Sequence, residues 1–242
     1  MATCKFDWSS INRYELNDYI WSLHPKVINK EMTIANFHRL VGNHIKKHIP
    51  IKLKKWGDSD VESNCAWVGG AYYSDLDKQK QKSIELVLVY KSRENSIKIT
   101  PINFQRSCRT ITHTIMHEII HMRQYRRRKF KELPDYNSTA KKTEQREEQS
   151  YLGCSDEIDA YGFNIACELL WKFNNDTDKV ISYLNEDQHG KRRRHNSWRL
   201  YLKAFNHDHE HPIIKRVKQK VVRYLPNAIY GKPYRNKDWI NR

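Results

Sequence analysis

Glycine is scarce in this sequence, and long apolar runs are missing from it. Only 8 of the 242 residues are glycine, and no stretch is rich in glycine and serine, so the sequence predicts no flexible linker, internal repeat or low-complexity block. No run approaches the about 18 apolar residues of a membrane-spanning helix, and the first residues lack the apolar core of a secretory signal. We therefore expect a cytoplasmic protein with no membrane partner.

Cysteines are odd in number and far apart, at Cys4, Cys65, Cys108, Cys154 and Cys167. No two of them form a CxxC pair, which excludes a zinc ribbon or zinc finger of the usual spacing. A scattered, odd set also argues against a disulfide framework. We expect reduced thiols, as in an intracellular protein.

Acidic residues are outnumbered by basic ones, 28 against 44, which gives a formal net charge of +16. Such a chain is attracted to polyanions and acidic surfaces, and salt weakens that attraction. The basic residues gather in Lys52–Lys55, Arg123–Lys129, Lys191–Arg194 and Lys215–Arg223. Two interpretations stay open: solvated helix faces that serve solubility alone, or a surface that contacts nucleic acid or an acidic protein.

Apolar residues, at 38% of the chain, suffice for a sizeable core, and their spacing predicts helices in the first 48 residues. In residues 33–47 they recur at helical spacing, so this segment is predicted to be an amphipathic helix with Thr33 as its N-cap. An earlier helix is predicted over residues 10–23. It should end before Pro25, because the residue that precedes a proline avoids helical backbone angles.

The pattern then changes to short runs rich in β-branched residues, which are typical of strands. Strands are predicted over residues 51–54, 65–73, 83–90 and 96–100. The second contains a Gly69-Gly70 pair in its middle, and the polar residues 75–81 are interpreted as a hairpin loop. These runs predict a small sheet of three to four strands.

From about Arg109 the helical pattern returns. One apolar stripe extends to Met122, and the helix should be over by Pro134. The polar residues 135–150 are interpreted as a loop or an exposed helix, and Ser155 is a suitable N-cap for the helix that follows. Further helices are predicted over residues 177–185, 197–205 and 212–224.

Helices, then strands, then helices again indicate an α+β fold. Because no linker interrupts the sequence, we expect a single domain over residues 1–242. Within it we expect a helical N-terminal part (1–48), a core that contains the sheet and the site (49–172), and a basic helical extension (173–242).

The segment His117-Glu118-Ile119-Ile120-His121 matches the pattern HExxH within the predicted second-half helix. Positions i and i+4 lie one turn apart on the same face of a helix, so two imidazoles there can grip one Zn²⁺ ion. Glu118, beside the first histidine, can take a proton from an attacking water and return it to the leaving amine. We predict a zinc site with His117 and His121 as ligands and Glu118 as catalytic base and acid.

His113 lies one turn before His117. Three histidines along one straight helix cannot easily surround one ion, because the outer two are about 12 Å apart by helix rise. We therefore expect His113 to be a neighbour of the site and not a ligand.

The third ligand is expected to be a carboxylate from a later helix, because no third histidine follows His121 at the spacing of metzincins. Glu157 is the best candidate, and Ala160 beside it would allow two helices to approach closely. Asp159 is expected to support a ligand histidine through the second ring nitrogen of that histidine. The alternatives that remain open as third ligand are Asp156, Glu147, Glu148 and Glu168.

An HExxH helix that follows strands and precedes a Glu157-Ile-Asp159-Ala-Tyr161 segment resembles the gluzincin-type metallopeptidases. It is most similar to the small peptidase-like proteins often encoded by bacteriophages, over about residues 65–172. The resemblance implies a zincin-like fold, with Glu157 completing the zinc site. It also implies that an edge strand beside the motif helix holds the peptide by strand addition. Here that strand is Ala66–Tyr73, and its central residues are Trp67, Val68, Gly69, Gly70 and Ala71.

The glycine pair in this strand would allow a substrate backbone to approach closely. A β-bulge at Gly69-Gly70 is the other interpretation that stays open. Tyr151 and Tyr161 are the candidates for stabilising the oxyanion. Alternating histidines in His207–His211 are interpreted as the lead-in to the helix at Pro212, not as a second metal site.

The sequence therefore predicts zinc-dependent hydrolysis of peptide bonds, with a protein or peptide as substrate. Two other classes of function stay open. One is a basic, nucleic-acid-associated binding protein in which the motif is incidental. The other is a zincin-like scaffold in a larger assembly, without turnover.

Overall fold

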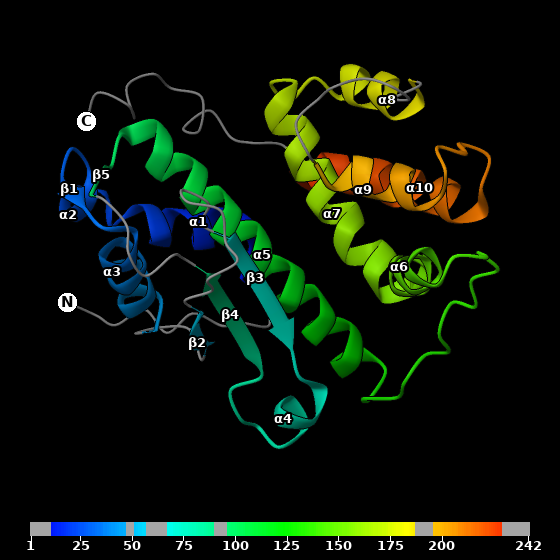
Figure 1. The fold of residues 1–242 in the computed structure, drawn as a ribbon, viewed down its shortest axis with the longest axis horizontal. Coiled ribbons are helices and arrows are strands. Elements are labelled where there is room, and N and C mark those ends of the chain that lie inside the picture. The colour runs from blue at the N-terminus through cyan, green and yellow to red at the C-terminus, as the bar shows by residue number, and fades with distance from the viewer. Residues whose placement is uncertain (1–10, 47–50, 57–66, 90–95, 187–195, 229–242) are drawn as a thin grey trace. The chain divides into compact units, whose positions relative to one another are not determined.

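The computed structural model of the chain describes residues 11–46, 51–56, 67–89, 96–186 and 196–228. Its elements form two compact units, Met1–Phe130 and Lys131–Arg242. Figure 1 shows that the strands belong to the first unit and that the second is built from helices among the described residues.

A small mixed sheet organises the first unit. Its strands β2 (Ile51–Trp56), β3 (Trp67–Tyr72) and β4 (Ile84–Val89) are ordered β2-β4-β3. β2 runs parallel to β4, whereas β3 is antiparallel to β4 in a continuous register. Within the described part of the chain, β3 therefore lies at the edge of the sheet, as the sequence predicted.

A long helix, α5 (Pro101–Arg127), lies along β3 and also contacts β4 (Figure 1). The other elements of the unit are α1 (Arg13–Trp21), α2 (His24–Val27), β1 (Glu31–Met32), α3 (Ile34–Lys46), α4 (Ser74–Lys78) and β5 (Ile97–Lys98). α1 packs against α5, and α3 contacts both α1 and β2. β1 and β5 form a short antiparallel pair.

Aromatic and branched side chains from these helices form the core of the first unit. Phe104 at the start of α5 is fully buried, with its ring centroid 5.2 Å from that of Trp21 and 6.0 Å from that of Phe37. The apolar stripe of α5, which includes Ile111, Ile115 and Ile119, is also buried. This stripe fixes the rotation of α5, and with it the direction in which the side chains of the HExxH motif point.

α5 begins earlier than the sequence predicted, at Pro101 and not near Arg109. The Thr100 hydroxyl accepts a hydrogen bond from the Asn103 N–H (3.2 Å), and Pro101 occupies the first turn, where its missing N–H costs nothing. The helix ends at Arg127, before Lys129 and Phe130 adopt positive φ angles of 56° and 60°. The predicted end before Pro134 is confirmed.

The second unit is a helical assembly centred on α7 (Ser155–Lys172). α7 contacts every other helix described in this unit: α6 (Thr143–Gly153), α8 (Thr177–Asn185), α9 (Ser197–Ala204) and α10 (Pro212–Ala228). Trp198 and Tyr201 of α9 are fully buried, and the Tyr201 hydroxyl donates a hydrogen bond to the Leu152 carbonyl at 3.0 Å. This bond ties α9 to the end of α6.

α7 and α10 approach each other closely at Gly162. A Cβ atom at this position would lie 2.7 Å from the Cβ of Lys220, which is shorter than side-chain carbons tolerate. Ala160, which the sequence suggested for close helix packing, is fully buried, but glycine makes the tight contact.

Two predictions of local structure are wrong. Residues 75–81 were predicted as a loop, but Ser74–Lys78 form the short helix α4, with Asp75 and Asp77 in its first turn. Ser155 is the first residue of α7, not its cap, and the cap position is Cys154. The predicted end of the first helix before Pro25 is confirmed, because α1 ends at Trp21 and Pro25 lies in the first turn of α2, which tolerates proline.

The other expectations agree closely with the structure. Thr33 caps α3 by accepting a hydrogen bond from the Asn36 N–H (3.2 Å), and the polar segment 135–150 contains the first part of the helix α6. Cys108, Cys154 and Cys167 are free thiols, whereas Cys4 and Cys65 lie outside the described residues.

The mixture of many helices with a small sheet confirms the α+β class. The boundary between the two compact units, at Phe130, differs from the predicted boundary after residue 172. That the chain forms one zincin-like domain stays a prediction.

Candidate metal centre

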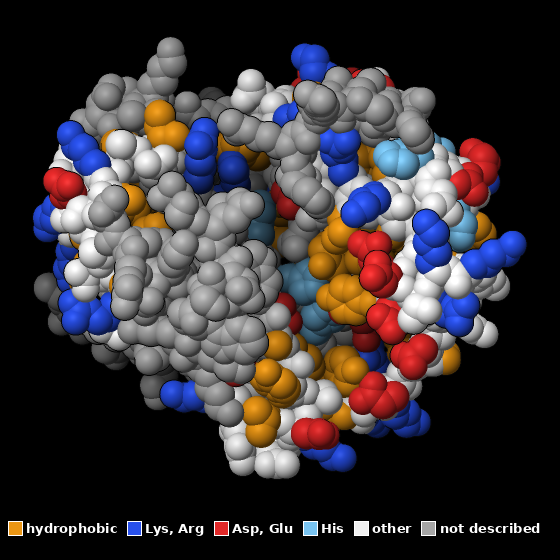
Figure 2. All heavy atoms as spheres, in the orientation of Figure 1, with side chains coloured by type: hydrophobic (Ala, Val, Ile, Leu, Met, Phe, Trp, Pro, Cys, Tyr) orange, Lys and Arg blue, Asp and Glu red, His pale blue; other side chains and the backbone are white. Residues whose placement is uncertain are grey.

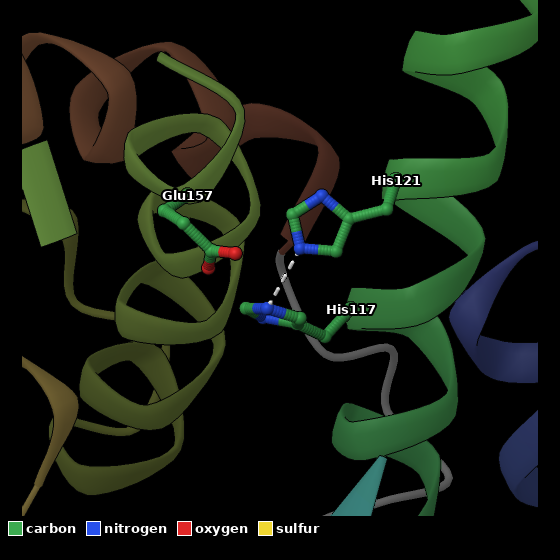
Figure 3. Close-up of side chains that lie close together, drawn as sticks. All are labelled: His117, His121 and Glu157. Atoms are coloured by element: carbon green, nitrogen blue, oxygen red, sulfur yellow. Dashed lines mark hydrogen bonds between the residues drawn. The ribbon is translucent and has the colours of Figure 1, made fainter. Parts of the chain in front are cut away.

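α5 presents His117 and His121 on adjacent turns of one face, as the HExxH spacing predicted. Their Nε2 atoms are 3.1 Å apart, and both side chains are buried. Figure 3 shows the two imidazoles, which point toward each other from α5. Two ring nitrogens that converge in this way are typical of histidines that face one metal ion.

Gln124, which sequence reasoning missed, contacts the other nitrogen of His121. The His121 Nδ1 atom lies 2.9 Å from the Gln124 Oε1 atom, and both side chains are buried. An amide oxygen can only accept, so Nδ1 carries the hydrogen and Nε2 keeps its lone pair free to bind a metal. The only signal for Gln124 in the sequence is its position one turn after His121 on a buried helix face, where a polar side chain needs a hydrogen-bond partner.

A carboxylate joins the two histidines. His117, His121 and Glu157 each offer one ligand atom, and these atoms all lie within 4.8 Å of one another. Figure 3 shows the Glu157 carboxylate, which comes from the first turn of α7. This buried to half-buried group of two imidazoles and one carboxylate can hold a metal ion.

The three residues fit a zinc ion in donor type, and the two imidazoles also fit it in spacing. Neighbouring ligand atoms of tetrahedral zinc are about 3.3 Å apart when the bonds measure about 2.0–2.1 Å. The two Nε2 atoms, at 3.1 Å, are close to this separation. Three protein ligands would leave a fourth position open, as catalytic zinc sites require.

The alternative carboxylates do not join this group among the described residues. Glu168 instead accepts hydrogen bonds from the Ser197 N–H (2.9 Å) and the Ser197 hydroxyl (2.7 Å), so it caps the start of α9. Glu147 is exposed on α6, and Glu148 is half-exposed there. Asp156 stands beside Glu157 in the first turn of α7 and is also outside the group.

Asp159 joins α7 to α10. It accepts a hydrogen bond from the Lys220 Nζ atom (2.7 Å) and another from the Tyr224 hydroxyl (3.2 Å). That Asp159 also supports a ligand histidine stays a prediction. Sequence reasoning assigned no comparable role to Gln124, whose Oε1 atom contacts the Nδ1 atom of His121.

Tyr151 and Tyr161 lie next to Glu157 within the second unit. Burial raises the pKa of the Tyr151 hydroxyl far above its ordinary value, and the charge of Glu157 and hydrogen bonds with Glu157 and Tyr161 add to the shift. Although half of the Tyr151 side chain is exposed, its hydroxyl is therefore protonated and can donate to the carboxylate. The rings of Tyr151 and Tyr161 meet edge to face at 6.5 Å. Tyr151 thus holds Glu157 and is itself held by Tyr161, and the role of the two tyrosines at an oxyanion stays a prediction.

Glu118 is buried against the edge strand. A Cβ atom at Gly70 of β3 would lie 2.7 Å from the Glu118 Oε1 atom and 2.9 Å from its Cγ atom. The register of β3 with β4 is continuous from Trp67 to Tyr72, so the glycine pair makes no β-bulge. The close neighbour of Gly70 is therefore the motif helix, and the approach of a substrate backbone to the glycine pair stays a prediction.

His113 is buried on α5 and is not in the group of potential ligands, which agrees with its predicted place as a neighbour. Burial lowers its pKa well below the ordinary value, and the nearby charges of Arg13 and Arg109 lower it further. His113 is therefore neutral at pH 7 and adds no positive charge that would oppose a cation.

The segment His207–His211 leads into α10, as predicted. The His211 Nδ1 atom accepts a hydrogen bond from the Ile213 N–H at 3.2 Å, and the ring of His209 meets that of Trp198 edge to face. No second group with the geometry of a metal site occurs among the described residues.

Basic side chains on α10 have partners within the second unit. Lys215 pairs with Glu210 (2.6 Å), Lys220 with Asp159 (2.7 Å), and Arg216 donates to the Ser155 hydroxyl (2.8 Å). On the face drawn in Figure 2, Lys and Arg side chains are interspersed with acidic and uncharged ones. Lys191–Arg194 lies outside the described residues. Contact with nucleic acid or an acidic protein stays a prediction.

No helix formed by the described residues has the length and apolar character needed to cross a membrane. Comparison with protein-family models, curated proteins and solved structures gave no match for this chain.

Proposed function

We propose that this protein is a zinc-dependent peptidase in which His117, His121 and Glu157 hold the metal and Glu118 is the general base and acid. The observation that carries the proposal is the convergence of the two Nε2 atoms, 3.1 Å apart, on the helix that also bears Glu118. The carboxylate of Glu157 supplies the third donor. An accidental HExxH on a helix surface would require neither this burial nor a third donor.

The chemistry follows from the donors and from the charge of Glu118. Bound zinc supplies Lewis acidity toward the scissile carbonyl and lowers the pKa of water. The Glu118 carboxylate takes a proton from the attacking water as the water oxygen bonds to the carbonyl carbon. It gives this proton to the amide nitrogen as the C–N bond breaks, so that the products are a carboxylic acid and an amine.

The edge strand β3 supports a peptide as the substrate. Its outer side lies free of sheet partners among the described residues, so the backbone of Val68 to Ala71 can pair with an extended chain. α5 packs against the same strand, which keeps Glu118 near that backbone.

The first test is metal content by elemental analysis of the wild type and of two histidine variants. We expect about one zinc per chain in the wild type and in His24→Ala, whose half-exposed histidine on α2 lies outside the ligand group, and a loss of zinc in His117→Ala. Glu157→Gln should also lose zinc, whereas Asp156→Asn, one residue away, should keep it. A wild type that binds no zinc when zinc is supplied would rule out the proposal.

The second test separates catalysis from binding. Glu118→Gln should keep one zinc and hydrolyse fluorescein-labelled casein and a mixture of internally quenched peptides about 10²–10⁴-fold more slowly, because a positioned general base contributes that much. Zinc binding without any hydrolysis by the wild type would favour the catalytically silent scaffold over the peptidase.

A further inference from the structure

Gly70 of β3 faces the catalytic carboxylate directly. The nearest atoms to a Cβ at this position would be Glu118 Oε1 at 2.7 Å, Glu118 Cγ at 2.9 Å and Thr114 Cγ2 at 2.9 Å. Real Cβ atoms do not approach other heavy atoms this closely, so any other residue at position 70 requires one of these groups to move.

Three groups could give way to a methyl group at position 70. Two of them, the Thr114 side chain and the strand β3, have little freedom to move. Thr114 is β-branched on a helix, where its side chain has restricted rotamers. β3 is held by its ladder to β4, where Gly70 is opposite Leu86. The terminal carboxylate of Glu118, with three rotatable bonds, is the group that can move at least cost.

A second contact fixes the position of β3 along α5. Arg126 near the end of α5 donates two hydrogen bonds to Asp77 of α4, from Nε at 2.8 Å and from the guanidinium nitrogen at 2.6 Å. The Tyr72 hydroxyl of β3 donates to the same carboxylate at 2.9 Å, and its ring contacts that of Tyr125. Tyr72 and Gly70 lie on the same side of the strand. The contacts among Arg126, Asp77 and Tyr72 therefore also set the position of Gly70 along α5, beside Glu118.

We infer that Gly70 is a positioning residue for Glu118: the missing side chain at position 70 creates the space that holds the carboxylate at the height of the metal ligands. This inference rests on the proposed function, since it concerns the general base of that reaction. It assigns the second glycine of the Gly69-Gly70 pair to the enzyme's own acid–base group, in addition to any contact with a substrate backbone.

The rate of a reaction that uses a general base depends steeply on the position of that base. A displacement of about 1 Å costs on the order of 10²-fold in rate. A methyl group at position 70 pushes the carboxylate away without touching His117 or His121, so metal binding should survive. The signature of Gly70→Ala is therefore a lower kcat at unchanged KM and unchanged zinc content.

The experiment measures kcat, KM, zinc content and the thermal midpoint for Gly70→Ala, with Gly42→Ala as its control. Gly42 lies on α3, outside the HExxH helix and the edge strand, so Gly42→Ala makes the same change away from Glu118. We expect an about 100-fold loss of kcat for Gly70→Ala on internally quenched peptides, with one zinc retained. Gly42→Ala should keep most of the wild-type kcat.

A double variant distinguishes positioning from general damage. Glu118→Asp withdraws the carboxylate by one methylene from position 70, so Gly70→Ala should cost less than about 5-fold in that background, because the two changes act on one contact. An equal loss in both backgrounds would overturn the inference. So would full kcat in Gly70→Ala while the wild type is active, which leaves the peptidase proposal intact. A wild type that binds zinc and hydrolyses no peptide overturns both.

Discussion

At the scale of single residues, the tautomer of His121 depends on Gln124. The Gln124 Oε1 atom lies 2.9 Å from Nδ1 and leaves Nε2 to face the Nε2 atom of His117. Because both side chains are buried, water cannot easily replace this contact. Gln124 therefore supports the metal site without touching the metal.

Gln124→Ala should lower the affinity for zinc about 10–100-fold, since supporting partners of ligand histidines contribute that much. Gln124→Glu keeps an acceptor oxygen and should retain the affinity. Competition of zinc between the protein and a chromogenic chelator measures both. Gln105→Ala, a glutamine-to-alanine change at a half-exposed position on the same helix, is the control. An unchanged affinity in a folded Gln124→Ala protein would show that the contact has no effect on the site.

Sequence reasoning predicted the site residues that follow from helix periodicity and missed those that follow from packing. The spacing of His117 and His121 fixes their common face, because a helix turns by about 100° per residue. The contact of Gly70 with Glu118 was missed, since Glu118 is 48 positions away in the chain and no local pattern records that contact. The hydrogen bond of Asp159 with Lys220 of α10 was missed for the same reason.

At the scale of elements, the contact of β3 with α5 is held by one buried carboxylate. The Asp77 side chain is 3% exposed and that of Arg126 is 45% exposed, so the acid depends on partners that water replaces only in part. The Tyr72 hydroxyl is its third donor, and burial raises the pKa of this hydroxyl, with the hydrogen bond to Asp77 and its charge adding to the shift. The hydroxyl therefore stays a donor at neutral and mildly alkaline pH.

Arg126→Ala should lower the free energy of unfolding by about 1–3 kcal/mol, because it removes two donors from a buried carboxylate while the exposure of Arg126 limits the loss. Urea titration measures this change. Arg127→Ala, at the adjacent exposed position, should change the free energy by less than about 0.5 kcal/mol. In a Tyr72→Phe background, Arg126→Ala should change the free energy of unfolding by a different amount, because both side chains donate to Asp77. Strictly additive changes would argue against this shared partner.

The bounds of elements with a strong apolar period were predicted closely. The start of a helix that depends on a capping residue was not. The strand β4 and the helices α3 and α8 match the sequence prediction to within a residue or two. The apolar stripe from Ile111 onward placed the start of α5 too late, and the Thr100 cap with Pro101 after it marks the start. α4 consists of Ser74–Lys78, a segment too short for a periodic pattern.

At the scale of the whole molecule, charge and chain division were the hardest features to interpret from sequence. A net charge of +16 suggested a polyanion partner, yet cations of α10 bind acidic and polar groups of their own unit. The division at Phe130 follows the end of a continuous helix and is marked by no glycine-rich or proline-rich linker. Such a boundary depends on which surfaces pack together, and composition does not report that.

A metal that binds only the folded chain should stabilise the whole molecule. At a free zinc concentration 100 times the dissociation constant, mass action adds about 2.7 kcal/mol. For a chain of this size that gain raises the thermal midpoint by about 5–10 °C. Differential scanning fluorimetry of chelator-treated wild type, with and without added zinc, measures the shift. His117→Ala should unfold at the same temperature in both conditions, because its ligand pair is broken. An equal rise in the wild type and in His117→Ala would place the stabilising zinc elsewhere on the chain, and a rise confined to the wild type would tie it to the two imidazoles on α5.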